Sequence, residues 1–223
     1  MNWAPIILSL QLAMVTTLIL VLVTLPLAWW LYRQRSWLKI MVESLVSLPL
    51  VLPPTVIGFY LLLAFSPGNA FGAWLQDSLG LELIFSFEGL VIASTIYSLP
   101  FMVHPIVSGL NNLPLQLREA SISLGKSEWT SYLRVLLPNI KPSILTGIVL
   151  SFAHTIGEFG IVLMIGGSIP GKTRVAAIAI YDEVEALNFS QAHIYSLILL
   201  IACFVILMIV YAINGGLMKR YWQ

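Results

Sequence analysis

Long runs of apolar residues, separated by shorter polar segments, dominate the pattern of this chain. A transmembrane helix needs about 20 mostly apolar residues, because it must cross a hydrocarbon core about 30 Å thick. Five runs reach that length: residues 6–31, 38–65, 90–110, 140–165 and 192–213. The pattern therefore predicts an all-α membrane protein with about five transmembrane helices, folded as a single domain over residues 1–223.

The composition supports a membrane protein and argues against a soluble enzyme. Hydrophobic residues make up 59% of the chain and charged residues only 9%, whereas soluble domains are about 45–50% apolar and about 25% charged. The net charge of +1 gives no indication of nucleic-acid binding. The single cysteine, Cys203, excludes an intramolecular disulfide, and the three histidines are scattered, so we expect no metal site and no cofactor.

The first apolar run differs from a cleaved signal peptide. No basic residue precedes it, it is longer than the apolar core of a signal peptide, and Arg33, Arg35 and Lys39 follow it directly. We therefore expect it to remain in the protein as the first span.

Lysine and arginine are distributed unevenly among the segments that connect the runs. Cytoplasmic loops of membrane proteins carry an excess of these residues. Nine of the eleven fall in alternate connecting segments and the tail: Arg33, Arg35, Lys39, Arg118, Lys126, Arg134, Lys141, Lys219 and Arg220. Only Lys172 and Arg174 fall on the other side. This distribution predicts a multi-pass protein of the cell (inner) membrane with its N-terminus outside and its C-terminus in the cytoplasm.

The connecting segment 113–138 predicts a short, partly amphipathic helix on the cytoplasmic side. Its apolar positions alternate with polar ones: Leu117, Ala120, Ile122 and Leu124. Gly125 follows as a usual C-terminal helix cap, and a second short helix is expected before Pro138. An exposed apolar helix fits a groove in a partner protein. From the residues alone, a loop helix that rests on the bilayer is an equal alternative.

The same segment resembles the EAA signature of ABC importer permeases, which reads Glu-Ala-Ala, three residues, Gly, nine residues and Ile-x-Leu-Pro. The spacing holds throughout, with two small or apolar replacements, Ser121 for the second Ala and Val135 for the Ile. In that family this loop forms the coupling helices that dock into the ATPase subunit. The resemblance therefore implies a coupling role for six residues: Glu119, Ala120, Ser121, Gly125, Leu137 and Pro138.

The resemblance covers nearly the whole chain. Ser-Leu-Pro-Leu-Val-Leu-Pro-Pro at 47–54, Gly-Glu-Phe-Gly at 157–160 and Ile-Pro-Gly-Lys-Thr at 169–173 look like the molybdate and sulfate branch of these permeases. The resemblance implies an ABC importer permease for an oxyanion, most closely molybdate, with tungstate and sulfate as alternatives. It further implies a homodimer in the lipid, two cytoplasmic ATPase subunits and an extracytoplasmic oxyanion-binding protein. ATP hydrolysis would take place in the separate subunits, so this chain is not itself an enzyme.

Four residues are candidates for the translocation pathway or its gate. His154 and Glu158 lie four apart in the fourth run, which predicts that they share a helix face. An ionisable residue at membrane depth costs at least about 2.5 kcal/mol, so it should face protein or water. Glu158 then either serves the pathway or locks helices together by a hydrogen bond. Pro53 and Pro54 interrupt the second run and are the other two candidates.

A proton-coupled secondary carrier, with Glu158 and His154 as its relay, is the rival class. Such carriers show internal repeats or paired broken helices, and apart from the prolines the sequence shows neither.

Residues 166–173, Gly-Gly-Ser-Ile-Pro-Gly-Lys-Thr, match the P-loop pattern letter for letter. A P-loop follows a buried strand and opens a helix, whereas this segment follows an apolar run and is predicted to lie outside. We therefore expect that Lys172 binds no nucleotide.

Overall fold

The computed structural model describes residues 2–214, and every regular element within that range is a helix. Three helices are long and apolar enough to cross a membrane unbroken. These are α1 (Ala4–Arg33), α5 (Phe87–Asn111) and α12 (Phe189–Asn214). Two bent pairs of helices raise the number to five if each pair is one span. The prediction of an all-α membrane protein is confirmed.

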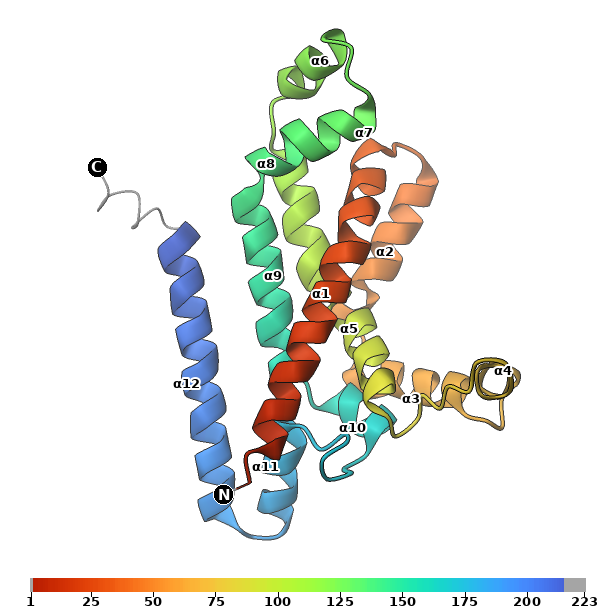
Figure 1. The fold of residues 1–223 in the computed structure, drawn as a ribbon, viewed down its shortest axis with the longest axis vertical. Helices are drawn as coiled ribbons and strands as arrows, with labels where there is room; N and C mark the ends of the chain where they lie inside the picture. The colour runs from red at the N-terminus through yellow and green to blue at the C-terminus, as the bar shows by residue number, and fades with distance from the viewer. Residues whose placement is uncertain (1, 215–223) are drawn as a thin grey trace.

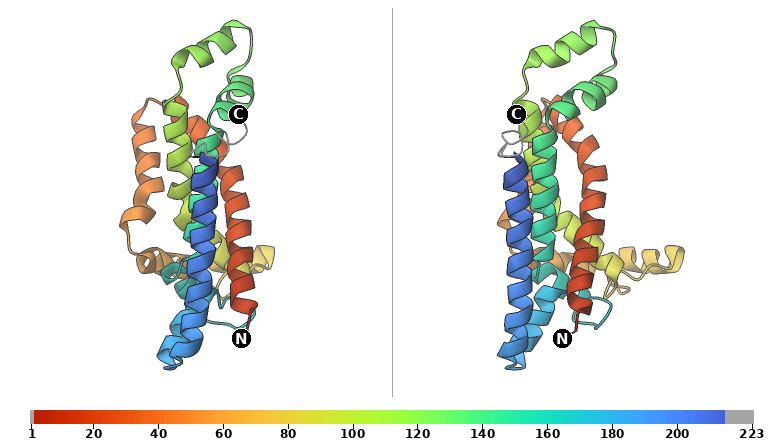
Figure 2. Two further views of the ribbon diagram at one scale, coloured as in Figure 1. Left: turned by 90° about the vertical axis from the view of Figure 1, so that its left-hand side faces the viewer. Right: turned by 60° about the vertical axis from the view of Figure 1, so that its left-hand side comes forward.

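The shorter helices gather at the two ends of the bundle (Figure 1). After α2 (Trp37–Val51), the chain forms α3 (Pro54–Phe65) and α4 (Ala70–Leu79) beside the N-terminal half of the bundle, and both run across its axis (Figure 2). Between α5 and α9 (Lys141–Ile156) it forms α6 (Leu115–Ser123), α7 (Glu128–Ser131), the π-helical turn η1 (Tyr132–Leu136) and α8 (Leu137–Asn139). The elements α10 (Gly160–Gly166) and α11 (Ala176–Glu185) lie toward the end of the bundle opposite α6. We call the end that carries α6 the loop end and the opposite one the N-terminal end.

The second apolar run is not one straight span, which corrects the expectation for residues 38–65. The directions of α2 and α3 differ by 112°. A residue that precedes proline is pushed into an extended conformation, and here two such residues follow each other. Leu52 and Pro53 both have a ψ of 138°, so the helix ends and the chain turns sideways.

The fourth run, expected at residues 140–165, is also interrupted. The helix α9 ends at Ile156, residues 157–159 are not helical, and α10 begins at Gly160. At its other end α9 bends by 78° against the helical segment Glu128–Asn139. The apolar run therefore supplies one straight helix of 16 residues and a separate short helix of 7 residues.

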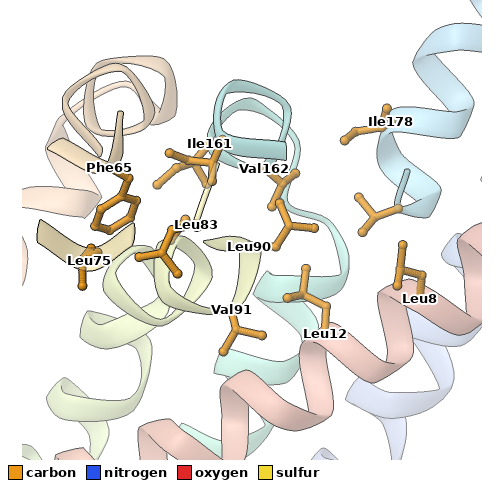
Figure 3. Packing of buried hydrophobic residues seen from close by; sticks show 13 residues of the cluster. Leu8, Leu12, Phe65, Leu75, Leu83, Leu90, Val91, Ile161, Val162 and Ile178 are labelled. Carbon is orange, nitrogen blue, oxygen red and sulfur yellow. The ribbon is translucent and has the colours of Figure 1, made fainter. Parts of the chain in front are cut away.

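The bundle is packed around α1, α5 and α9. Within a membrane, helices associate mainly through close van der Waals packing at small residues. Gly109 of α5 meets this description, because a Cβ atom there would lie 2.5 Å from the Ser143 hydroxyl oxygen of α9. One apolar cluster fills the N-terminal half and includes Leu12, Leu90 and Ile161 (Figure 3). A second fills the half toward the loop end.

The described basic residues remain segregated in three dimensions. Seven lie toward the loop end: Arg33, Arg35, Lys39, Arg118, Lys126, Arg134 and Lys141. Lys172 and Arg174 lie toward the N-terminal end. Lys219 and Arg220, which also entered the orientation prediction, lie outside the described residues. The orientation of the termini stays a prediction.

Candidate functional site

The helix α6 projects beyond the rest of the molecule at the loop end (Figures 1 and 2). It ends in a Schellman motif, in which a left-handed residue closes the last turn. The N–H of Gly125 donates to the Ile122 carbonyl at 2.8 Å, and the N–H of Lys126 donates to the Ser121 carbonyl at 3.2 Å. Gly125 has a φ of +78°, which L-residues rarely adopt. The glycine of the signature therefore sets the direction in which the chain leaves α6.

The outer surface of α6 combines apolar groups with one unpaired carboxylate. Ile122 is exposed, Leu124 at the tip is 80% exposed, and Ala120 is exposed beside them. Glu119 is exposed too and forms no ion pair with any residue in the range 2–214. Exposed apolar side chains grouped at the end of a projecting helix form a patch that would suit a groove in another protein.

Glu128 anchors this projection to the rest of the protein. One of its carboxylate oxygens accepts from Arg118 of α6 at 2.5 Å, and the other pairs with Nε of Arg33, the last residue of α1, at 2.9 Å. Because this carboxylate is shared by two guanidinium groups, it fixes both the position and the orientation of α6 relative to α1. Sequence reasoning missed this role, since the three residues come from three separate helices.

Aromatic side chains reinforce the anchor. The ring of Trp129 meets that of Trp29 edge-on, with centroids 5.1 Å apart, and the Arg33 guanidinium lies 4.8 Å from the Trp29 ring centre. The fully buried Tyr132 donates its hydroxyl proton to the Leu25 carbonyl of α1 at 2.7 Å. The loop is thereby attached to α1 over two helical turns.

The six coupling residues of the sequence prediction fall into two groups. Glu119, Ala120, Ser121 and Gly125 lie in or directly after α6. Ser121 is buried and shares a hydrogen bond of 2.8 Å with the Ser131 hydroxyl, which explains why a hydroxyl suits this position. Leu137 and Pro138 lie in α8, below the projection, where Leu137 packs against the apolar cluster of the loop end.

Pro53, Pro54 and Glu158 lie at the two breaks, which touch each other. A Cβ atom on Gly160, where α10 begins, would lie 3.0 Å from Cβ of Pro54, where α3 begins. The helices α3 and α10 also pack side by side, since Gly58 leaves room for Met164. Two interrupted helices thus meet at one place in the bundle.

Glu158 does not share a helix face with His154, which corrects the prediction from their spacing. The helix ends at Ile156, and Glu158 follows it within the break. Its side chain is buried, with the residue 5% exposed, and neither carboxylate oxygen has a hydrogen-bond partner among residues 2–214. The Ser94 hydroxyl of α5 lies nearby, also buried and unpartnered, but the pair lacks hydrogen-bond geometry.

His154 lies in α9 and is held by α5. Its Nδ1 lies 3.0 Å from the Ser98 hydroxyl, and its ring stacks on Phe101 with centroids 4.0 Å apart. Tyr97 packs against the same ring, with centroids 5.2 Å apart. His154 is therefore held by side chains of α5, whereas Glu158 lies in the break beyond the end of α9.

The touching breaks also bear on the rival class. Paired broken helices were the feature expected of a secondary carrier, and the structure contains such a pair. This feature therefore does not separate the two classes, and similarity to known proteins has to decide between them.

The P-loop pattern has no P-loop structure around it. The helix α10, not a strand, precedes it, and Lys172 and Thr173 lie in a loop before α11 begins at Ala176. Thr173 is buried, donates its hydroxyl proton to the Gly166 carbonyl at 2.6 Å and accepts from the Ile169 N–H at 3.1 Å. Elsewhere in the described range, no group of three or more His, Cys, Asp or Glu side chains could hold a metal ion.

Comparisons with known proteins decide the family. Residues 21–223 match the family described as "Binding-protein-dependent transport system inner membrane component". The chain is 48% identical over 191 residues to the molybdenum transport system permease protein ModB of Azotobacter vinelandii, covering 85% of this chain and 84% of that protein. It is 31% identical over 190 residues to the sulfate transport system permease protein CysT of Escherichia coli, covering 85% and 67%.

Among solved structures, a bacterial ABC transporter involved in the import of the acidic polysaccharide alginate has a similar fold. The TM-score is 0.69 at 16% sequence identity, over 96% of this chain and 79% of that one. At that identity the likeness concerns the fold alone. The match over residues 21–223 and the 48% identity to a permease of this kind show that this chain belongs to the family of inner membrane components of binding-protein-dependent transport systems.

Proposed function

We propose that this chain is the permease subunit of an ABC importer whose cargo is molybdate. The observation that carries the cargo is the difference in similarity, 48% to a molybdenum permease against 31% to a sulfate permease over nearly equal lengths. Tungstate, a tetrahedral dianion of nearly the same shape, and sulfate are the alternative cargoes. ATP hydrolysis belongs to a separate subunit, and this chain has no catalytic residue in the proposal.

The surface that we assign to the ATPase is the exposed side of α6, with Glu119, Ala120, Ile122 and Leu124. Its apolar residues suit an apolar groove, and the free carboxylate of Glu119 suits a basic residue at the groove's rim. Leu137 and Pro138 support the projection from below and do not themselves enter the groove. In this proposal the loop end is cytoplasmic, and the N-terminus faces outside.

We assign the gate to the place where the two breaks touch. Pro53 and Pro54 end one helix and start another, and Glu158 lies in the second break. Chain segments without helical hydrogen bonds change direction at lower cost than a continuous helix. Glu158 is buried within the subunit here, so in this proposal it is packed inside the gate, between the parts that move, and does not line an open passage. His154 positions α9 against α5 beside it.

A second copy of this chain, the bilayer and an external binding protein complete the transporter. The exposed apolar residues of α12, including Leu200, Phe204 and Met208, suit lipid or a second copy. The predicted oxyanion-binding protein would deliver cargo at the N-terminal end.

Uptake by proteoliposomes tests this function. The chain is reconstituted with its ATPase subunits, and labelled molybdate is supplied with the binding protein outside and ATP inside. We expect uptake that requires ATP, is competed strongly by tungstate and only weakly by sulfate, and is insensitive to an imposed pH gradient. Stronger competition by sulfate would reassign the cargo. Uptake that a pH gradient drives without ATP would support the proton-coupled class instead.

A further inference from the structure

A cavity of about 540 Å³ opens at the loop end, where α1 ends, α2 begins and α5 ends. Four cationic side chains line it, together with neutral hydrogen-bonding groups: Arg33, Arg35, Lys39, Arg118, Asn111 and Tyr32. None of its lining residues is acidic. The cavity lies beside the coupling loop, and the coupling residues do not explain it.

The charges around this cavity do not cancel. Glu128, next to it, is shared by Arg33 and Arg118, and Glu43 lies 3.7 Å from Lys39. Within the described part of the chain, Arg35 has no ion pair and no hydrogen bond from its side chain. Two carboxylates against four cations leave two positive charges in excess, directed at a space large enough for a small anionic group.

An apolar groove of about 480 Å³ runs along α2, starting in the same helical turn. Its main residues are spaced three and four apart on one face: Leu38, Met41, Leu45 and Leu48. Trp37, at the start of α2, is 66% exposed, as expected of a side chain at the level of the lipid headgroups. Lys39 belongs to the cationic cavity and Leu38 to the groove, so one turn of helix joins the two.

We propose that this composite site binds an acidic phospholipid of the cytoplasmic leaflet. The phosphate of the headgroup lies among Arg33, Arg35 and Lys39, because guanidinium and ammonium groups are the natural partners of phosphate oxygens. One acyl chain follows the groove on α2. Basic pockets between helices on the cytoplasmic side recognise acidic headgroups in this way. The proposal uses the orientation proposed above only to choose the leaflet, and it is independent of the cargo.

Lipid occupancy has a structural consequence for the coupling loop. Arg33 and Arg118 line the cavity and also hold Glu128, the anchor of the loop. A phosphate bound beside Arg33 reduces the repulsion between the two guanidinium groups that share Glu128. The lipid therefore stabilises the attachment of α6 to α1.

Native mass spectrometry of the purified full-length chain tests the site, with dioleoyl-phosphatidylglycerol, dioleoyl-phosphatidylcholine and inorganic phosphate as probes. We expect retention of phosphatidylglycerol over phosphatidylcholine. Each of Arg35→Gln and Lys39→Gln should weaken retention about fivefold, the effect of about one charge near a membrane surface. Arg35→Gln breaks no pair in the described structure, so loss of folding does not account for its effect.

Two control variants separate this site from nonspecific attraction of lipid to the basic surface. Lys141→Gln removes an exposed basic residue toward the same end but outside the cavity, and it should retain phosphatidylglycerol like the wild type. Leu45→Ser, in the groove, should weaken lipid retention without affecting inorganic phosphate. An equal loss in Lys141→Gln, or equal retention of phosphatidylcholine, would overturn the proposal. Phosphate that displaces the lipid equally well from the wild type and from Leu45→Ser would show a free oxyanion site instead.

Discussion

Replacing Gly125 by valine tests whether the end of α6 must leave the helix in a left-handed turn. Apart from the two adjacent residues, nothing lies within 4 Å of the position that a Cβ would take, so a Cβ there meets no other part of the structure. The cost is confined to the backbone, whose φ of +78° is unfavourable for an L-residue by about 1–2 kcal/mol. A β-branched side chain should come at the upper end of that range. Asparagine tolerates this conformation, so Gly125→Asn should cost clearly less.

A free energy of that size corresponds to a factor of about 5–30 in the population of the docking-competent turn. We expect Gly125→Val to lower retention of the ATPase subunits, and ATP hydrolysis stimulated by loaded binding protein, within that range. The assay is copurification from membranes followed by hydrolysis in proteoliposomes. Gly80 is the matched control, because it caps α4 with a φ of +63° and also has no atom within 4 Å of its Cβ position. Wild-type coupling in Gly125→Val, or the same defect in Gly80→Val, would refute the reasoning.

Three further predictions address Glu158 at the proposed gate, the orientation of the chain in the membrane, and the P-loop pattern at residues 166–173. Glu158→Gln keeps the shape of the buried side chain and removes its charge, so molybdate uptake should fall severalfold while ATP dependence and the pH profile of uptake stay unchanged. A large shift of that pH profile would support the proton-coupled class. In a Cys203→Ala background, cysteines at the exposed positions Asn69 and Lys126 should react with an impermeant thiol reagent from opposite sides of the membrane, and labelling of both in intact cells would contradict the orientation. Lys172→Ala should leave nucleotide binding and ATP hydrolysis of the complex at wild-type levels, whereas their loss with the ATPase still attached would show that the 166–173 loop binds nucleotide.

Hydrophobic runs predicted how many times the chain could cross a membrane but not where it changes direction. An average over 20 residues registers apolar composition, and two uncharged prolines lower that average too little to mark a break. Prolines at 26, 49, 100 and 105 lie inside continuous helices. Two adjacent prolines force two successive extended residues, and this rule could have located the first break.

In the coupling loop, too, the sequence predicts the features that depend on neighbouring residues and misses those that depend on contacts between distant segments. Gly125 and the apolar positions of α6 follow from short-range rules for helix ends and amphipathic faces. The anchor formed by Glu128, Arg33 and Trp29 depends on which segments the fold brings together, and one sequence does not contain that information. The expected pairing of His154 with Glu158 was wrong because it assumed that the helix continues past Ile156.

Because of the sharp bend between α2 and α3, a rotation of α2 becomes a sideways movement of α3. Rotation of α2 about its own axis does not displace α2, but it swings α3, which stands off that axis at 112°. Because a helix rises 1.5 Å per residue, α3 has an arm of about 18 Å, and a twist of about 10° would move its far end by about 3 Å. The packing of α3 along α10, where Gly58 lies against Met164, would pass part of that movement on to α10. A small rotation of α2 at the loop end would therefore move α3 sideways near the opposite surface, and neither helix would have to bend.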